Sequence, residues 1–256
     1  MHRNEATQPP RLANGRAVNN SILQSIPQEE FATVVAHLEF VPLEVRQVLL
    51  SPGERIEFGF FVNQGVISNL VVTSDAGSVE VGSVGTEGFV GAELAADSSE
   101  SPQRAIVLSP GDGFRIKADA LVSLLPSTPI LYSELMRELM LRGLRASQVA
   151  ACNRLHQIEQ RLCRWLLTSY DRVGSNPFPI THEQLSQILG SGRPSLTVAA
   201  GILQKNGSVE YKRGSMRILN RKALEESACE CYGVMQRMSR NAQMKQPRIT
   251  REREEA

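Results

Sequence analysis

The spacing of hydrophobic residues changes along the chain. In its first half, this spacing predicts a β-rich unit. Between residues 41 and 121, short runs of Val, Ile, Leu and Phe are interrupted by Gly, Pro, Asn and Asp roughly every 8–12 residues, as in small antiparallel barrels and jelly rolls. A helix is expected before this unit, over residues 21–38, with apolar Ile22, Phe31 and Val34 on it. We therefore expect an antiparallel β-barrel preceded by one helix.

Residues 130–172 contain no proline and place apolar residues at helical spacing. One line along this predicted helix consists of Leu131, Leu135 and Leu139. A neighbouring line consists of Met136, Met140 and Leu144. Packing against the chain's own barrel is one explanation of such a helix. A dimer seam is favoured, because one helix face is poorly suited to burying both lines in a single chain.

The region from residue 180 to residue 219 carries the local signals of a helix-turn-helix followed by a small hairpin. Thr181 and Gln184 form the Thr-x-x-Gln pattern of a capping box, which predicts a helix start. Gly190, Ser191 and Gly192 supply the turn, since glycine adopts backbone angles that are closed to larger residues. The second helix is expected to begin near residue 193, with a proline in its first turn, and to end at a left-handed glycine at position 207.

The predicted second helix has an inward face, formed by Leu196, Ala199, Ile202 and Leu203, and an outward face. Arg193 on the outward face can bond guanine O6 and N7 together, and hydroxyls beside it can reach bases or phosphates. The hairpin after the helix is a predicted wing, whose basic residues suit phosphates. The predicted DNA-binding residues are Thr181, Ser191, Arg193, Ser195, Thr197, Lys212, Arg213 and Arg217. An ordinary helical hairpin is the alternative, and the combination of cap, turn and wing disfavours it.

After the wing, Asn220 is expected to cap one closing helix. The apolar face of that helix includes Leu224, Ala228, Tyr232, Met235 and Met238.

Charge is distributed unevenly along a chain whose net charge is only +1. Residues 153–222 carry 11 Lys and Arg against 4 Asp and Glu, a balance of +7, whereas residues 1–152 carry 11 against 17, a balance of −6. The basic segment coincides with the predicted helix-turn-helix, which indicates that this part meets a polyanion.

Several other functional classes are disfavoured. No apolar run approaches the roughly 20 residues that span a bilayer, and the first 20 residues lack the apolar core of a secretory signal. Residues 1–20 and 241–256 are expected to be a disordered arm and tail. Four scattered histidines and the lack of a nucleophile–base motif argue against an enzyme.

The four cysteines do not form a disulfide framework, so a reducing, cytoplasmic location is expected. Cys152 and His156 have the i, i+4 spacing that can share a metal ion, but two ligands are too few. Cys229 and Cys231 are expected on a helix, pointing to different faces. No metal or cofactor is therefore predicted.

Three sequence segments closely resemble the Crp/Fnr superfamily of bacterial transcription regulators: QRLCRWLL at 160–167, FPITHEQLSQILGSGRPSLTVAAGILQKNGSVEY, and RKALEESACECYGVM. A weaker resemblance runs through LLSPGE at 49–54, FFVNQGVIS at 60–68 and GTEGFVGAELAAD at 85–97. The resemblance implies an α+β chain with an N-terminal cyclic-nucleotide-binding-like jelly-roll barrel at residues 21–128. It further implies a dimerisation helix at 129–155 and a winged helix-turn-helix at 156–240. Arg193 takes the position of the family's guanine-reading arginine, and Pro194 replaces a base-reading glutamate of some members.

The resemblance is less complete at the implied effector pocket. Members that bind cyclic AMP use a glutamate directly after the glycine turn and an Arg-Ser pair before the next strand. Here Gly91 is followed by Ala92, with Glu93 one position late, and Gln103-Arg104 replaces the pair. Cyclic-nucleotide binding is therefore disfavoured, and Gly91, Glu93 and Arg104 are retained as candidate residues of an effector pocket.

These observations predict a homodimeric, sequence-specific DNA-binding regulator whose barrel biases the DNA-binding domains. Its expected partners are double-stranded DNA, a second copy of the chain, an unidentified small-molecule effector and, as a candidate, RNA polymerase; no membrane is involved. The alternative is a ligand-sensing module with little DNA role.

Overall fold

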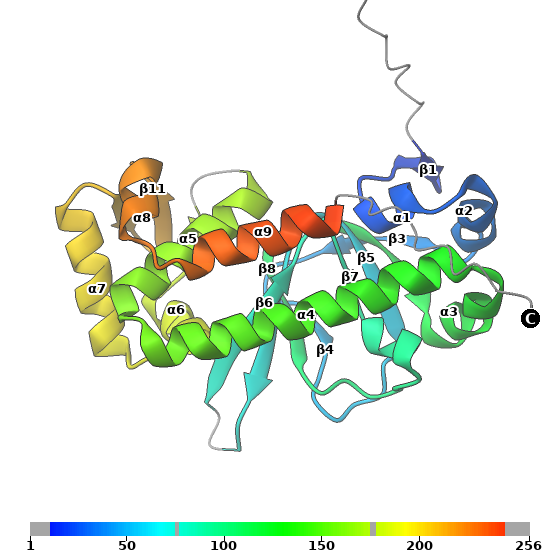
Figure 1. The fold of residues 1–256 in the computed structure, drawn as a ribbon, viewed down its shortest axis with the longest axis horizontal. Helices are drawn as coiled ribbons and strands as arrows, with labels where there is room; N and C mark the ends of the chain where they lie inside the picture. The colour runs from blue at the N-terminus through cyan, green and yellow to red at the C-terminus, as the bar shows by residue number, and fades with distance from the viewer. Residues whose placement is uncertain (1–10, 75–76, 175–177, 244–256) are drawn as a thin grey trace, which may run out of the picture.

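The computed structural model describes residues 11–74, 77–174 and 178–243. Most of the arm and tail expected to be disordered, residues 1–10 and 244–256, lies outside the described residues. Along the described chain a β-barrel, a long helix and a helical domain follow one another, with the helical domain at one end of the molecule (Figure 1).

Two long strands form the framework of the predicted antiparallel barrel. β5 (Phe58–Val72) and β8 (Arg104–Lys117) pair with each other over most of their length. β3 (Glu39–Leu43) and β4 (Val48–Leu50) pair with β8, whereas β6 (Ser78–Val84) and β7 (Phe89–Val90) pair with β5. The expected α+β fold with an antiparallel jelly-roll barrel is confirmed.

Close backbone approach bends the long strands where the sequence suggests an interruption. The pairing of β5 with β8 shifts register between Val62 and Ile67, and Gly65 has a φ of +97° there. A Cβ atom on Gly111 would lie 2.1 Å from the Gln64 carbonyl oxygen. Glycine therefore lets β8 continue through this bend as one strand instead of ending in a turn.

The N-terminal part differs from the sequence prediction in two ways. Residues 21–38 form two helices, α1 (Ser21–Ser25) and α2 (Gln28–Val35), because Pro27 interrupts the backbone hydrogen bonds between them. Residues 11–20 are ordered rather than disordered. β1 (Leu12–Ala13) and β2 (Arg16–Ala17) form a hairpin there, and Ala13 and Val18 are buried in the barrel core.

The predicted long helix is α4 (Pro129–Leu155), which follows η1 (Ala92–Ala96), α3 (Ala118–Leu124) and η2 (Leu125–Ser127). Leu131 and Leu135 are fully buried against the barrel, whereas Met140 is 57% and Leu144 45% exposed. The two apolar lines thus separate, one facing the chain's own core and the other largely uncovered in a single chain.

The C-terminal domain consists of α5 (Ile158–Val173), β9 (Phe178–Pro179), α6 (His182–Leu189), α7 (Arg193–Lys205), β10 (Val209–Lys212), β11 (Ser215–Ile218), α8 (Arg221–Ser227) and α9 (Cys231–Gln243). The prediction of a single closing helix is wrong. Ala228 adopts extended angles, φ −75° and ψ 151°, and separates α8 from α9. The second helix, α9, then runs back along α4 (Figure 1).

Candidate DNA-binding surface

The first helix of the motif, α6, begins and ends as its sequence predicts. The Thr181 hydroxyl accepts from the Gln184 amide, and the Gln184 side chain reaches back to the Thr181 amide, so the capping box is complete. Gly190 then adopts left-handed angles, φ +55° and ψ +49°. Arg161 of α5 donates a hydrogen bond to the Leu189 carbonyl at this end of the helix. This hydrogen bond from α5 therefore stabilises the start of the turn.

The second helix, α7, presents a short apolar face to the core. Leu196, Ala199, Ala200 and Leu203 are buried, but Ile202, which the sequence analysis placed inward, is 47% exposed. The buried residues follow the i, i+3, i+4, i+7 spacing of one helix face, which includes Ala200 and leaves out Ile202. Pro194 lies in the first turn and Gly207, with φ +74°, follows the last, both as predicted.

Arg193 is the first residue of α7, and its side chain is 69% exposed. Its only ion pair in the described chain is a loose one, with Nε 3.9 Å from Glu183 Oε2. Ser195 and Thr197 are also exposed, although the Thr197 hydroxyl donates to the Arg193 carbonyl at 2.9 Å. The guanidinium is therefore free to be redirected to a new acceptor.

Two of the predicted DNA-binding hydroxyls are turned toward the protein. The Thr181 hydroxyl is engaged with Gln184. The Ser191 oxygen is buried and has no hydrogen-bond partner among the described residues. Their contacts with DNA stay predictions, and in this conformation both residues shape the motif.

The wing is a tight hairpin beside α7. β10 pairs with β11 in antiparallel register, with Lys212 opposite Ser215. Arg213 and Gly214 both have positive φ, +50° and +76°, so the turn between the strands has only these two residues. Lys212, Arg213 and Arg217 are exposed, and Lys212 Nζ lies 2.5 Å from Glu210 Oε1. These three basic side chains are thus exposed on a hairpin that packs beside α7.

His182 contacts both α7 and the wing, and it is not among the residues predicted from the sequence. Its ring stacks on Tyr211 of the wing at 4.1 Å between centroids. Its Nδ1 lies 3.3 Å from the Thr197 hydroxyl of α7. Burial and the nearby Arg193 charge lower the pKa of His182. One side chain therefore contacts both α7 and the wing, which fixes their relative position.

Residues 160–227 match the Crp-like helix-turn-helix domain family. This part of the chain is a Crp-like helix-turn-helix domain. A comparison with curated proteins finds no match. In the fold, the whole chain is similar to a Crp/Fnr-family transcriptional regulator from Eubacterium rectale, with 15% identity, a TM-score of 0.67, and 82% of this chain and 98% of the other covered.

Further structures of the same kind share the fold. The c-di-GMP-responsive global regulator CLP of Xanthomonas campestris is 17% identical, with a TM-score of 0.63 over 75% of this chain and 99% of that one. FixK2 of Bradyrhizobium japonicum is 13% identical, with a TM-score of 0.64 over 75% and 98%. The helix-turn-helix domain is therefore that of a DNA-binding transcription regulator, and the chain shares the fold of Crp/Fnr-type regulators.

Part of the positive charge in the C-terminal half of this regulator is buried or paired inside the protein. Arg161 and Arg164 are buried, and Arg172 pairs with Glu87 at 2.9 Å. The exposed positive charge of this segment is therefore smaller than the local sequence balance of +7 suggests. It is concentrated on α7 and the wing.

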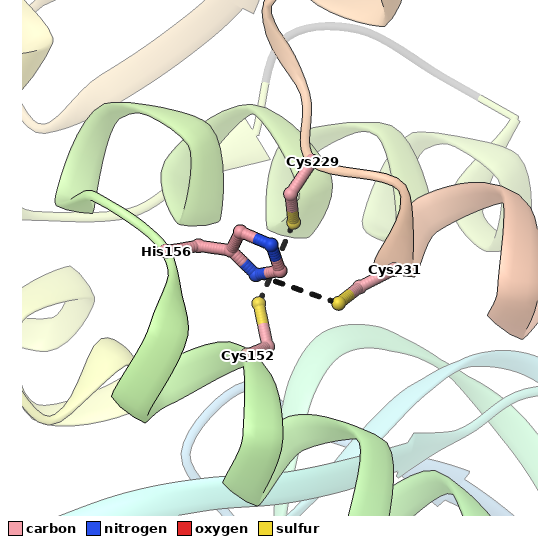
Figure 2. A group of neighbouring side chains, drawn as sticks. All are labelled: Cys152, His156, Cys229 and Cys231. Atoms are coloured by element: carbon pink, nitrogen blue, oxygen red, sulfur yellow. Dashed lines mark hydrogen bonds between the residues drawn. The ribbon is translucent and has the colours of Figure 1, made fainter.

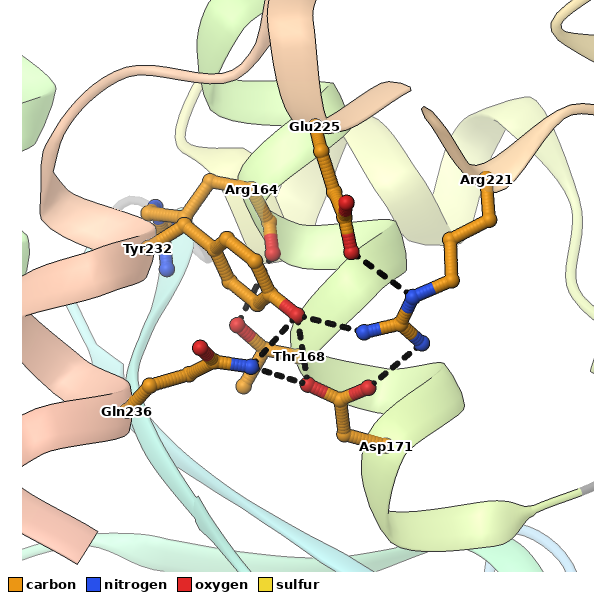
Figure 3. A network of polar contacts seen from close by, with 7 residues as sticks. All are labelled: Arg164, Thr168, Asp171, Arg221, Glu225, Tyr232 and Gln236. Carbon is orange, nitrogen blue, oxygen red and sulfur yellow. Dashed lines mark hydrogen bonds and ion pairs between the residues drawn. The ribbon is translucent and has the colours of Figure 1, made fainter. Parts of the chain in front are cut away.

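A polar network fastens the closing helices of the regulator to α5 (Figure 3). Arg221 donates to Asp171 Oδ1 at 2.7 Å, and Tyr232 donates its hydroxyl to Asp171 Oδ2 at 2.8 Å. Gln236 adds a bond of 3.1 Å to the same oxygen, while Glu225 pairs with Arg221 at 2.7 Å. The start of α9 is therefore fixed relative to α5 by side chains from three helices.

The barrel contacts the DNA-binding domain through buried carboxylates. Trp165 of α5 donates to Glu80 Oε1 of β6 at 3.1 Å, and Ser68 donates to the other oxygen at 2.5 Å. Burial raises the pKa of Glu80. On α4, Glu138 lies 3.4 Å from Arg145, and burial raises its pKa to about 7. Ionisable groups therefore sit where the barrel, α4 and α5 meet.

We expect the Glu138→Gln variant to lose part of the parent's pH dependence of stability. Folding raises the pKa of Glu138, so the folded chain binds more protons than the unfolded chain between about pH 4.3 and pH 7. The free energy of unfolding in the parent should therefore fall as pH rises through this window, by about 4 kcal/mol at most from this one group. Urea unfolding between pH 4.5 and pH 8 measures the slope. Glu44→Gln, which changes an exposed carboxyl, is the control; equal slopes in the parent and Glu138→Gln would contradict the prediction.

The candidate effector residues lie near a cavity of about 200 Å³ between the barrel and α4. Glu93 lines it, and its carboxylate pairs with Arg142 of α4 at 3.0 Å. Gln103 lines it too, and Arg104 begins β8 beside it. Gly91, with φ +94°, precedes the 3-10 turn that carries Glu93. The Glu93 carboxylate, which was expected to contact a ligand, therefore already forms an ion pair with α4.

Within the described residues, no helix is both long and apolar enough to cross a bilayer.

Proposed function

We propose that the chain is a homodimeric regulator that reads a near-palindromic DNA site with two copies of α7, without an enzymatic step. The observation that carries this proposal is Arg193, an exposed guanidinium at the N-terminal end of a helix held by a capped partner helix and a wing. Its neighbours Ser195 and Thr197 supply further contacts, and Lys212, Arg213 and Arg217 bind phosphates. Such a regulator acts in the cytoplasm, with RNA polymerase as a transient partner.

The uncovered side of α4 supports the dimer. Met140 and Leu144 are four residues apart and both exposed, so they form an apolar strip one turn long. Leu155, at the end of the same helix, is 73% exposed. Pairing of α4 with a second copy would bury this strip and place two recognition helices about a two-fold axis, with half-sites about one helical turn of DNA apart.

Selection from random DNA tests the function directly. The full-length chain is incubated with a random duplex library at physiological salt, and bound sequences are amplified over successive rounds. The proposal expects enrichment of a two-fold-symmetric sequence. Retention of DNA without any enriched sequence would contradict sequence-specific recognition, whereas a single enriched half-site would contradict only the dimer.

The Lys212→Ala variant is expected to bind every duplex more weakly by a similar factor. Lys212 lies on the wing, with its ammonium exposed and paired only with Glu210 in the described chain. Loss of one phosphate contact should reduce the slope of log affinity against log salt by about 1. Fluorescence anisotropy with the selected and a scrambled duplex at several salt concentrations measures this. A loss confined to the selected duplex would contradict a phosphate role.

Calorimetry with cyclic AMP and cyclic GMP is expected to give no binding heat. The cavity at Glu93 is about 200 Å³, below the roughly 300 Å³ at which ligand pockets begin. Glu93 is moreover paired with Arg142, so a ribose would have to break a buried ion pair. Saturable binding of either nucleotide would contradict this and move the proposal toward the sensing module.

A further inference from the structure

Four side chains from two distant parts of the chain meet at one point of the fold (Figure 2). Cys152, His156, Cys229 and Cys231 each offer one ligand atom, and these four atoms all lie within 4.8 Å of one another. Cys152 lies in the last turn of α4 and His156 directly follows that helix. Cys229 lies between α8 and α9, and Cys231 begins α9. The expectation that the last two cysteines point apart on one helix is wrong because the helix is broken between them.

Two of the distances between ligand atoms match those around a single tetrahedral ion. The Cys152 and Cys229 sulfur atoms are 3.5 Å apart, and Cys231 Sγ lies 3.6 Å from His156 Nδ1. Around a tetrahedral zinc ion with bonds of about 2.3 Å to sulfur and 2.0–2.1 Å to nitrogen, neighbouring ligand atoms lie about 3.5–3.8 Å apart. An iron–sulfur cluster spreads its cysteine ligands over several irons, which requires a wider arrangement. All three cysteines are buried and are free thiols.

The histidine is oriented as metal-binding histidines are. Its Nδ1 faces the sulfur atoms, and its Nε2 lies 3.2 Å from Glu230 Oε1. A carboxylate behind the ring fixes the tautomer in which Nδ1 is free to bind a metal. A disulfide between Cys152 and Cys229 would need neither this histidine nor Cys231. The full set of four residues is therefore better explained by an ion than by a redox pair.

Charge around the cluster gives a second, independent argument. Arg161 and Arg164 of α5 are buried, and neither makes an ion pair within the described ranges. Both lie within electrostatic range of Cys152. Zinc with three thiolates and a neutral histidine carries a net charge of −1, which would place negative charge beside these buried cations.

We propose that Cys152, His156, Cys229 and Cys231 bind one zinc ion, which ties the end of α4 to the joint between α8 and α9. Both attachment points are already set by other contacts: Cys152 by the helix α4, and α9 by the Asp171 network (Figure 3). His156 is also the residue at which the chain passes from α4 to the DNA-binding domain. The ion would therefore hold the connection between dimerisation helix and DNA-binding domain at one angle.

Metal analysis of the full-length chain is the first test. The chain is purified in reducing buffer after growth with added zinc, gel-filtered, and analysed for zinc, iron and acid-labile sulfide. We expect about one zinc ion per chain. After replacement of zinc by cobalt, we expect thiolate-to-cobalt charge-transfer absorption together with the intense visible bands of a tetrahedral site.

Variants of matched chemistry separate the site from general effects on folding. Cys229→Ser should lower the zinc content by at least about tenfold, because three ligands hold the ion less firmly than four. Cys163→Ser changes a buried cysteine of α5 outside the cluster and should retain zinc. Glu230→Gln alters only an exposed carboxylate. It should keep the fold and weaken zinc affinity about 10–100-fold in competition with a chelator.

The outcomes that overturn the proposal are distinct from one another. A folded parent that contains no zinc overturns it, as does a Cys152–Cys229 disulfide in the mass spectrum of the unreduced chain. Iron with sulfide in place of zinc overturns the assignment of a single ion. Equal zinc content in Cys229→Ser and Cys163→Ser shows that the ion binds elsewhere. None of these results depends on whether the chain selects a DNA sequence.

Discussion

The Arg193→Ala variant should lose most of the regulator's discrimination between its selected site and other DNA. Arg193 is the first residue of α7 and its guanidinium is exposed. A bidentate contact with guanine is worth about 1–3 kcal/mol of discrimination. Because a dimer makes this contact twice, the ratio of specific to nonspecific affinity should fall roughly 30-fold to 25,000-fold.

Anisotropy titrations with the selected duplex and with a scrambled one measure both affinities. Nonspecific binding should fall little, since one of several cations on the surface is lost. Arg55→Ala removes an equally exposed arginine of the barrel and should leave both affinities unchanged. If Arg193→Ala weakened both duplexes by the same factor, Arg193 would be a phosphate contact and the specificity would lie elsewhere on the surface.

The Leu144→Asp variant should convert the dimer to a monomer and abolish tight operator binding. Leu144 and Met140 form the uncovered apolar strip of α4, and an aspartate there would have to be buried without a partner in the dimer. Two such charges, one from each copy, should weaken dimerisation by at least about 100-fold. Sedimentation analysis measures the association, and anisotropy measures the operator affinity.

Val122→Asp provides the matched control, because Val122 is an exposed apolar residue of another helix, α3. It should sediment as the parent does. A Leu144→Asp chain that stayed dimeric would place the seam on another surface. If it became monomeric but kept its operator affinity, the two recognition helices would act independently.

The features that the sequence predicts correctly are those determined by residues close together along the chain. The Thr181–Gln184 capping box, the glycine turn at Gly190 and the proline in the first turn of α7 are short-range signals, and all three are present in the structure. The alternation of apolar runs and turn residues likewise indicates an antiparallel barrel. These features depend on residues that lie close together along the chain.

Tertiary contacts account for what the sequence could not predict. Leu224, Ala228 and Tyr232 continue one helical face, so periodicity alone gives no sign of the break at Ala228. The break brings Cys229 onto Cys152, 77 positions earlier. The motifs Cys-x₃-His and Cys-x-Cys together indicate a four-ligand metal site, but only if the second motif does not lie within one continuous helix.

The DNA-binding surface illustrates the same limit. Arg193 could be assigned from its position after the turn, whereas His182 acquires its role from a stack on Tyr211 that forms only when the wing folds back. Charge counting was misleading for Arg161, Arg164 and Arg172, because burial depends on the docking of α5 and not on its composition.

The turn of the helix-turn-helix motif also touches the barrel: a Cβ atom on Gly190 would lie 3.0 Å from a methyl carbon of Val79 on β6. Together with the Trp165–Glu80 bond, this contact gives the DNA-binding domain a second point of attachment besides the short connection at His156. If the DNA-binding domain rotates about this connection, its contacts with the barrel must break first. We therefore expect two discrete forms, one with the DNA-binding domain attached to the barrel and one with it released, with few intermediates between them. The response to any signal should then have a threshold.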